Sequence, residues 1–489
     1  MYEYLALMPV ILPLVGALLT YFLRRFSDKI QRVFLMGFAV VLFVLNVSYF
    51  MALQMNIIHP LSYGPVVLDA PGIFISCLVT FIGALVIFYS FVYKDKTHYD
   101  NTYFIMYFLL MGMMSGLACT YNVIVMLVFM EAATITSAVL ILFGRTKQAI
   151  KATYIYLAIS IVEVILVVTG AFILYNDTGT LDVSLSNISS MSQNTMFLLA
   201  MLFFFGFGTK AGLLPLSSIW LPSAHSEAPP PISATMSGIL IKASIIAMVK
   251  SVYPFYLMSG VGTLIFIVAA FGILSMLIGV IMALLSEDIK RLLAWHSISQ
   301  MGYIILGFGL AAPTAIYGAL FHITNHLLFK GCLFLITGAL ILRLNTRQIH
   351  KMGGLGKVMP LTAASFLIAS LAMSGVPFLN GFVSKELIYE GSVQAGYPVI
   401  FSVFGVNFTI FAILGWITSA LTFICLIHVF YVMFMGKQKE EFRNVRDPPV
   451  YMMLPILIMV GLCIVIGVYP DLISGTLKYT ADVLFQLRI

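Results

Sequence analysis

Apolar stretches of about twenty residues recur from one end of this 489-residue chain to the other, and they constrain its fold more than any other feature. Each is long enough to cross the roughly 30 Å hydrocarbon core of a bilayer as an α-helix. Helices also satisfy their own backbone hydrogen bonds there. Because the chain is 61% hydrophobic and only 9% charged, a soluble core is excluded. The sequence predicts an all-α polytopic membrane protein with about 14 transmembrane helices.

The expected spans cover residues 3–23, 33–53, 73–93, 102–119, 121–143, 152–175, 196–220, 231–253, 262–285, 292–311, 313–341, 360–390, 409–435 and 450–469.

The loops between these spans predict an orientation. Most of the 26 Lys and Arg residues lie in alternate loops, at 24–32, 94–96, 145–151, 290–291, 343–357 and 437–446. Since cytoplasmic loops are enriched in Lys and Arg, we expect both termini on the outer side of a cell (inner) membrane. The net charge of +7 follows from this bias and gives no reason to expect nucleic-acid binding. No basic residue precedes the first apolar run, so we expect a membrane helix there and not a cleaved signal peptide.

Several ionisable residues lie inside lipid-like runs. A charge at the bilayer centre costs roughly 2.5–3.5 kcal/mol, so these groups must pair, lose their charge or face internal water, and they commonly mark an ion path. A buried lysine holds its proton less tightly, and a nearby carboxylate restores its charge. Histidines four residues apart share a helix face and relay protons well. The residues are Glu131, Glu163, Lys210, Lys242, His322, His326, Lys330 and Lys385.

Two of the expected spans contain helix-breaking residues. Pro215 follows Lys210, and Pro377 precedes Lys385, each with a glycine nearby. Unwound backbone at membrane depth is tolerated only against protein or a watery cavity, and transporters place such breaks near their binding site. The sequence therefore predicts two broken helices, the alternative being two ordinary proline kinks.

Cofactor chemistry is not expected in this chain. The five cysteines are scattered without a CxxC pair, which argues against iron–sulfur, zinc and disulfide chemistry. The His322–His326 spacing is compatible with a metal, but Lys330 and the lipid-like surroundings argue against one. We expect no cofactor, no metal and no active site in this chain.

Four stretches together resemble a known family. They are GTKAGLLPLSSIWLPSAHSEAPPPISATMSGILIKAS (208–244), EDIKRLLAWHSISQMGY (287–303), HITNHLLFKG (322–331) and SGVPFLNGFVSKE (374–386). This combination resembles the antiporter-like proton-translocating subunits of respiratory complex I, of Mrp antiporters (the D-type subunit) and of membrane-bound nickel–iron hydrogenases.

The resemblance implies two inverted five-helix repeats with helices 7 and 12 broken. It divides the chain into helices 1–3 (1–100), a first half-channel of helices 4–8 (101–255), a second half-channel of helices 9–13 (256–436), and a last transmembrane helix with a short tail (437–489). That short tail lacks the long lateral helix of the most distal complex I subunit.

By position, the resemblance implies that Glu131 pairs with Lys210 and that Lys242 stands in the middle of a proton path. Glu163 lies where several relatives have a carboxylate. The path is then implied to continue through the group His322, His326 and Lys330, and to end at Lys385.

Other residues are candidates for the ends of the path. His225 and Glu227 lie in the loop HSEAPPP, as a proton entrance or as caps of the following helix. Glu386 is a candidate on the exit side. His428 is a relay member or a helix–helix hydrogen bond.

The leading hypothesis is a proton-translocating subunit of a multi-subunit complex, either redox-driven or of the Mrp type, with other membrane subunits and the bilayer as partners. One alternative is Na⁺/H⁺ antiport through the same polypeptide. Another is a passive membrane scaffold for a redox arm. A quinone-reducing enzyme is disfavoured because no cofactor motif is present. Whether the chain belongs to an oxidoreductase complex or to an Mrp antiporter stays open at this point.

Overall fold

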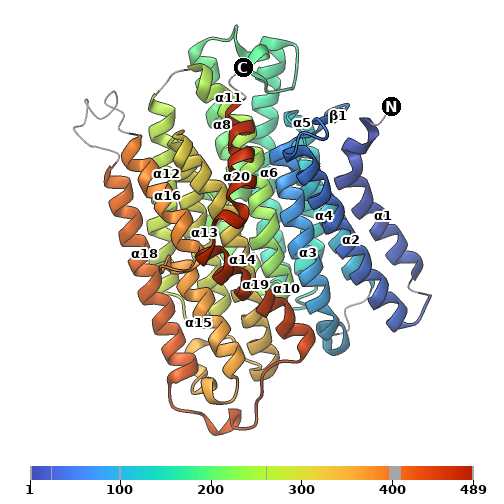
Figure 1. The fold of residues 1–489 in the computed structure, drawn as a ribbon, viewed down its shortest axis with the longest axis vertical. Helices are drawn as coiled ribbons and strands as arrows, with labels where there is room; N and C mark the ends of the chain where they lie inside the picture. Colours follow the sequence, from blue (N-terminus) through green and yellow to red (C-terminus); the bar gives the residue numbers. More distant parts are fainter. Residues whose placement is uncertain (1–2, 24, 98–100, 260–261, 396–408, 487–489) are drawn as a thin grey trace.

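The chain folds into a bundle of long helices that run roughly side by side (Figure 1). A computed structural model describes residues 3–23, 25–97, 101–259, 262–395 and 409–486. Helix α1 (Met8–Leu23) begins and α20 (Asp471–Gln486) ends at the same end of the bundle, which we call the terminal end. The loops around residues 345–359 and 436–449 lie at the opposite end, which we call the basic end.

The elements follow one another with short connections. The first are η1 (Glu3–Leu7), α1, α2 (Asp28–Gln54), the hairpin strands β1 (Leu61–Tyr63) and β2 (Val66–Leu68), and α3 (Ala70–Thr97). The first half of the bundle continues with α4 (Asn101–Ala118), α5 (Val123–Leu142), α6 (Lys147–Thr178), α7 (Leu185–Ile188), α8 (Gln193–Ala211), α9 (Leu216–Glu227), α10 (Pro230–Thr235), the π-helix η2 (Met236–Leu240) and α11 (Ile241–Ser259). The second half contains α12 (Gly262–Leu284), α13 (Ile289–Gly309), α14 (Pro313–Leu344), η3 (Ile349–Lys351), η4 (Leu355–Lys357), α15 (Pro360–Ser374), α16 (Asn380–Gln394), α18 (Thr409–Phe430), η5 (Tyr431–Met435), η6 (Glu440–Phe442), α19 (Val450–Val468) and α20.

The expected spans correspond to these helices. Within the described residues, 12 helical segments are long and apolar enough to cross a membrane, judged by length and composition. The expected spans 292–311 and 360–390 correspond to α13 and to the pair α15–α16. Polar side chains within α13 and the interruption of the other span explain why apolarity alone does not mark them. The all-helical membrane fold predicted from the sequence is confirmed.

Both predicted helix breaks are present. Between α8 and α9 the backbone turns at Gly212, whose φ of 90° lies in the left-handed region, and Pro215 follows. Between α15 and α16, Gly375 has a φ of 82° and Pro377 follows. Glycine adopts this conformation without steric strain, and proline cannot continue the preceding helix. Each break therefore leaves a lysine close to the ends of two half-helices.

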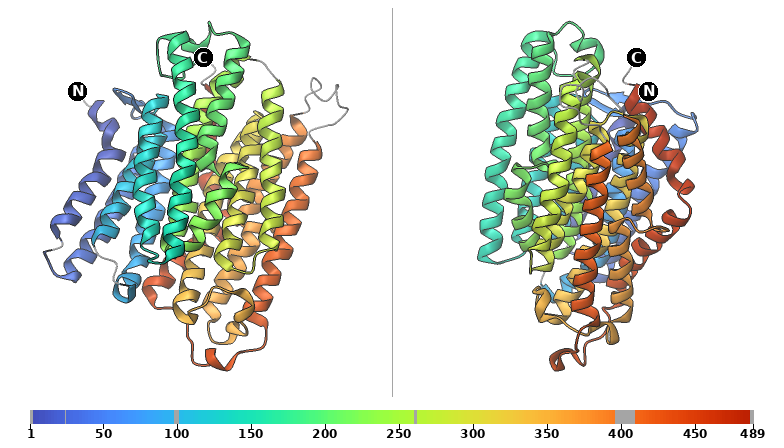
Figure 2. Two further views of the ribbon diagram at one scale, coloured as in Figure 1. Left: turned by 180° about the vertical axis from the view of Figure 1, so that it is seen from behind. Right: turned by 90° about the vertical axis from the view of Figure 1, so that its left-hand side faces the viewer.

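The last two helices lie on the outside of the bundle. Figure 2 shows α19 and α20 on the side of the molecule opposite α6, and α20 packs against α3 and α14. The sequence analysis did not predict α20 as a helix. At the terminal end, β1 and β2 form a two-stranded antiparallel hairpin with Leu61 opposite Leu68.

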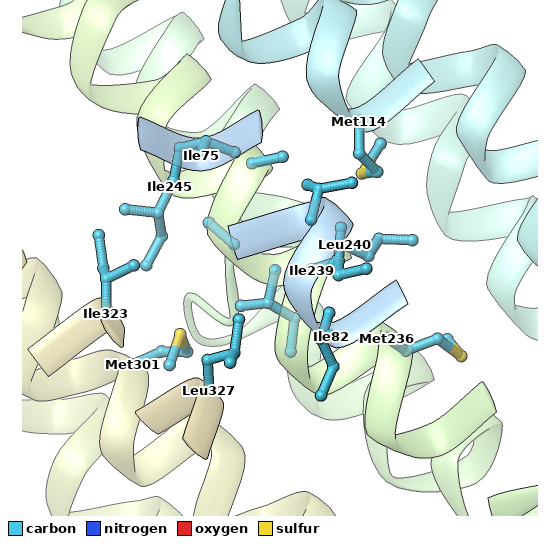
Figure 3. Packing of buried hydrophobic residues seen from close by; sticks show 14 of the residues in the cluster. Ile75, Ile82, Met114, Met236, Ile239, Leu240, Ile245, Met301, Ile323 and Leu327 are labelled. Carbon is cyan, nitrogen blue, oxygen red and sulfur yellow. The ribbon is translucent and has the colours of Figure 1, made fainter. Parts of the chain in front are cut away.

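Apolar side chains fill the middle of the molecule where the two halves meet (Figure 3). Ile75 and Ile82 of α3 lie there with Ile245 of α11 and with Ile323 and Leu327 of α14. All five side chains are essentially buried. Ionisable groups on α11 and α14 are therefore set in surroundings from which water is largely excluded.

Candidate functional site: a line of buried amines and imidazoles

The break after α8 holds Lys210 inside the first half of the bundle. Its side chain is fully buried, and Nζ donates a hydrogen bond of 2.5 Å to Ser160 Oγ of α6. The amine also lies 3.6 Å from the centroid of the Tyr156 ring, a favourable cation–π geometry. Trp220 of α9 fixes the break by donating to the carbonyl oxygen of Thr209 at 2.9 Å.

Two carboxylates face this amine without pairing with it. Glu131 and Glu163 each interact electrostatically with Lys210, but among the described residues neither forms an ion pair with it. Glu163 is fully buried and both of its carboxylate oxygens lack a hydrogen-bond partner, as does Oε1 of Glu131. Buried polar atoms are nearly always hydrogen-bonded, so these oxygens need water, a proton or a rearranged lysine.

Lys242 stands at the junction of the two halves. It is 1% exposed, and its amine contacts the carbonyl oxygen of Ser237 and Nδ1 of His326. Ser237 belongs to the π-helix η2, a distortion of a helix that is frequently found at functional sites. The contact with His326 of α14 joins the first half of the bundle to the second.

Two histidines on one face of α14 extend this contact. The rings of His322 and His326 have centroids 6.5 Å apart. Nδ1 of His322 lies 2.9 Å from Ser384 Oγ of α16, and Nε2 lies 3.2 Å from Gln300 Oε1 of α13. The imidazole of His322 is therefore held on both sides, and Ser384 is the immediate neighbour of Lys385 in the sequence.

Lys385 lies beside the second helix break. It is 2% exposed, and Nζ donates to the carbonyl oxygen of Met373 and to Ser419 Oγ, both at 2.9 Å. The hydroxyls of Tyr303 and Tyr389 also lie 2.9 Å from Ser419 Oγ. The ring of Tyr303 in turn lies 5.6 Å from that of His322. A group of hydroxyls thus connects the lysine with the histidine.

Lys330 lies beside this line and not within it. It is fully buried, and the hydrogen bond found for its amine is a weak one to the thioether of Met373 at 3.6 Å. Met373 therefore touches two lysines, Lys330 through its sulfur and Lys385 through its carbonyl oxygen.

At the basic end, Glu227 forms part of an ion-pair cluster. Arg347 contacts Glu227 at 2.9 Å and Asp288 at 2.6 Å. Partial burial disfavours the charge of Arg347, but Asp288 and Glu227 outweigh this and raise the pKa of its guanidinium above the usual value. Cavities of about 370 and 530 Å³ adjoin the cluster, and Glu227 and Arg347 line both.

His225 lies behind this cluster. It is fully buried, its ring stacks on Phe334 with centroids 5.2 Å apart, and neither ring nitrogen has a partner among the described residues. It interacts electrostatically with Lys242, Lys290 and Lys330. His225 thus stands between the cavities of the basic end and the central lysines.

The other two candidates lie nearer the surface. Glu386 is half-buried beside Trp416. His428 is half-buried and lines a cavity of about 730 Å³ at the basic end. Neither touches the line from Lys242 to Lys385 through a hydrogen bond found in the described residues.

One buried ion pair was missed by the sequence analysis. Lys250 of α11 contacts Asp69 at 3.2 Å, with both side chains almost completely buried. Tyr121 donates to Asp69 at 2.5 Å, and Lys250 donates to the carbonyl oxygen of Ala118 at 2.7 Å. Lys250 lies in the same apolar stretch as Lys242, so the criterion of a charge within an apolar run would have found it. The hydroxyls and amide that join the line, those of Gln300, Ser384 and Ser419, carry no such signal.

Metal ligation is the remaining chemical possibility at such a site. Over the described ranges, there is no group of three or more His, Cys, Asp or Glu residues that could hold a metal ion.

Comparison with known proteins identifies a family. Residues 120–412 match the sequence profile described as NADH:quinone oxidoreductase/Mrp antiporter, TM. The chain is 32% identical over 501 residues to a Na(+)/H(+) antiporter subunit of Alkalihalophilus pseudofirmus, with 95% of this chain and 61% of the relative covered. It is also 32% identical over 425 residues to hydrogenase-4 component B of Escherichia coli, with 83% of this chain and 62% of the relative covered. The chain thus spans less than two thirds of these relatives.

The fold is shared with a solved assembly. A chain in the structure of the Mrp complex from Dietzia sp. superposes with a TM-score of 0.87 over 99% of this chain and 98% of that chain, at 19% sequence identity.

Proposed function

Because the chain belongs to the NADH:quinone oxidoreductase/Mrp antiporter transmembrane family, we propose that it is a proton-translocating, antiporter-like subunit of a larger membrane complex. One observation carries this proposal. Lys242, His326, His322 and Lys385 follow one another through direct contacts, or through single hydroxyl groups, across the interior of the bundle. Every member of this line can bind or release a proton.

The first half of the bundle loads the line. Protons enter at the basic end, through the cavities at Glu227 and Arg347, and reach Lys242 by way of His225 and internal water. Glu131 and Glu163 control the charge of Lys210. When a carboxylate approaches the amine, the amine keeps its proton, and when they separate, burial favours release. In the present geometry the carboxylates and the amine are apart, with Lys210 held by Ser160.

The second half carries the proton away. A proton on Lys242 passes to His326 and His322, and then through Ser384 or Tyr303 and Ser419 to Lys385. Imidazole suits this step because each ring has one nitrogen to accept and one to donate. Glu386, half-buried near the terminal end of the break, continues the route outward. The segments 101–255 and 256–436 serve as two half-channels.

Protons fit the central line better than Na⁺. Hard cations such as Na⁺ prefer carboxylate, carbonyl and water oxygens, whereas amines and imidazoles line this path and a charged amine repels a cation. Na⁺/H⁺ exchange remains the second candidate because one relative is named as a Na(+)/H(+) antiporter subunit. Any redox chemistry of the host complex belongs to other subunits in this proposal.

The test is a variant of the central lysine in the assembled complex. Lys242→Met removes the proton-binding amine, so proton transport in proteoliposomes should fall by about 10²-fold, the scale on which positioned proton-transfer groups act. The complex should still assemble and co-purify. Lys351→Met, which removes an exposed lysine of the basic end, is the control and should transport normally.

Three outcomes separate the hypotheses. Full transport by Lys242→Met would refute the proton path and favour a passive scaffold. Wild-type transport that persists in Na⁺-free buffer supports protons alone. Transport that stops without Na⁺ supports Na⁺/H⁺ exchange.

A further inference from the structure

The largest cavity of the described residues lies outside the line just proposed. It has a volume of about 730 Å³ and opens at the basic end, between the end of α12, the start of α13 and the last turns of α18. Its polar lining consists of Ser286, Glu287, His350, Cys425 and His428. Because three of these side chains are ionisable at ordinary pH, the cavity is suited to water and protons more than to lipid tails.

The inner wall of this cavity borders on Lys330. Cys425 is 3% exposed, lines the cavity and interacts electrostatically with the amine of Lys330. An ammonium group has three donors to satisfy, but the bond found for this amine is the weak one to the thioether of Met373. A fully buried amine with such poor protein partners requires water.

Polar atoms without partners lie between Lys330 and the basic end. Thr337 of α14 is seven residues beyond Lys330, about 10 Å nearer that end, and its buried hydroxyl has no partner in the described part of the chain. The same is true of the Ser370 hydroxyl, one helical turn below Met373 on α15. Native proteins pair such atoms with ordered water when protein groups are missing.

His296 of α13 completes this set. It is fully buried, both of its ring nitrogens lack partners among the described residues, and it interacts electrostatically with Lys330 and Lys385. An imidazole between two lysines, with both nitrogens free to bind water, is placed to pass a proton from one to the other.

We propose that this cavity is a second proton entrance, which supplies Lys330 directly from the basic end. A proton taken from bulk water at His428 moves past Cys425 along waters held by Thr337 and Ser370 to the amine of Lys330. From there it passes through His296 to Lys385. The inference rests on the proposed function, and it assigns Lys330 an input role in place of the linking role that the sequence analysis gave it. The second half of the bundle then takes up protons without the Glu131–Lys210 pair.

Closing the cavity tests this route. Cys425→Phe fills the passage between the cavity and Lys330, so transport by the assembled complex should lose most of its rate. Cys425→Ala should transport normally, because no chemistry is assigned to the thiol. Ile417→Phe is the control for bulk on the same helix, since Ile417 is 46% exposed and does not line the cavity. Equal rates for Cys425→Phe and Ile417→Phe would overturn the proposal.

A variant nearer the mouth covers the case in which Cys425→Phe fails to assemble. Val432→Trp places a ring at a half-buried position of the lining, where it disturbs packing less. It should slow transport in the same way, and an unchanged rate would contradict the entrance.

Labelling of Cys425 tests the water route without any transport measurement. The other four cysteines, Cys77, Cys119, Cys332 and Cys463, are replaced by alanine, and the membrane-impermeant reagent methanethiosulfonate ethyltrimethylammonium is added to vesicles of known orientation. Cys425 should react from the basic side alone, and Val432→Trp should prevent the reaction. No reaction, or equal reaction from both sides, would refute the entrance.

The two proposals fail separately. If Lys242→Met transports normally, the proposed function is wrong whatever the labelling shows. If Lys242→Met is inactive but Cys425 is closed to the reagent, only the second entrance is wrong.

Discussion

At the scale of single residues, the pair Lys250–Asp69 differs from the lysines of the proton line. Its partners are direct and complete: Asp69 accepts from Lys250, from Tyr121 and from the backbone N–H of Gly72 at 2.8 Å. A buried charge with all its partners in place is held rigidly, whereas the amines of Lys210 and Lys330 have few protein partners. We infer that the pair stabilises the junction of α3, α4 and α11.

This difference predicts the effect of removing one partner. Lys250→Met leaves the Asp69 carboxylate buried without its counter-charge, which typically costs about 3–5 kcal/mol. The purified complex should therefore unfold at a clearly lower temperature in a thermal-shift measurement. The double variant Lys250→Met/Asp69→Asn should recover part of the loss, because no uncompensated charge remains. A single variant with unchanged stability but lost transport would instead place Lys250 on the proton path.

The sequence predicted the site residues better than it predicted their order. Glu131, Lys210, Lys242 and Lys385 stand out as charges in apolar runs, and each lies in the interior or at its edge. Lys330 was expected between the histidines and Lys385, but the structure places it to one side, against Met373. The order depends on which rotamers and neighbouring helices bring side chains together, and spacing along one helix does not contain that information.

At the scale of elements, the two helix breaks are built alike. Each has a glycine in the left-handed conformation, a proline shortly after it, and a lysine that the break directs inward. The sequence predicts both breaks because glycine and proline act locally. It does not predict α20, whose 16 residues carry charges and are too polar to be recognised as a membrane span.

Gly375 offers a test of what the second break does. A methyl group there would be strained by the φ of 82° and would meet Cδ of Lys385 at 3.0 Å. Strain of this kind costs about 1–3 kcal/mol. Gly375→Ala should therefore lower both the stability of the complex and its transport rate, because the Lys385 amine moves away from Ser419.

The matched control is Gly461→Ala in α19. No atom lies within 4 Å of the added methyl group there, so alanine should be neutral or should stabilise the helix by up to about 1 kcal/mol. Equal stability and transport for both alanine variants would show that the break tolerates a side chain and does not position Lys385.

At the scale of the whole molecule, the structure has two chemically different ends. The ion-pair cluster of Arg347 and both candidate entrances lie at the basic end, and the hairpin β1–β2 lies at the terminal end. Alternating spans of the predicted number bring all the basic loops to one side. The sequence predicts this arrangement well because lipid forces each span to cross completely.

Orientation follows from the same division. The positive-inside rule predicts that the basic end faces the cytoplasm. In intact cells, an impermeant maleimide should label a cysteine at Ser62→Cys in β1 and should leave Lys351→Cys in η3 unlabelled until the membrane is opened. The background for both is the chain without its native cysteines. The reverse labelling pattern would invert the direction of transport proposed above.

The apolar packing of Figure 3 has an energetic consequence for the cell. A membrane stores a voltage only while no continuous conductor crosses it, and every candidate proton carrier here ends against Ile75, Ile245 or Ile323 unless a side chain or a water chain moves. These isoleucines act as electrical insulation between two acid–base circuits. A substitution that wetted them would discharge the membrane even with the complex idle, and growth would suffer before any loss of folding was detected.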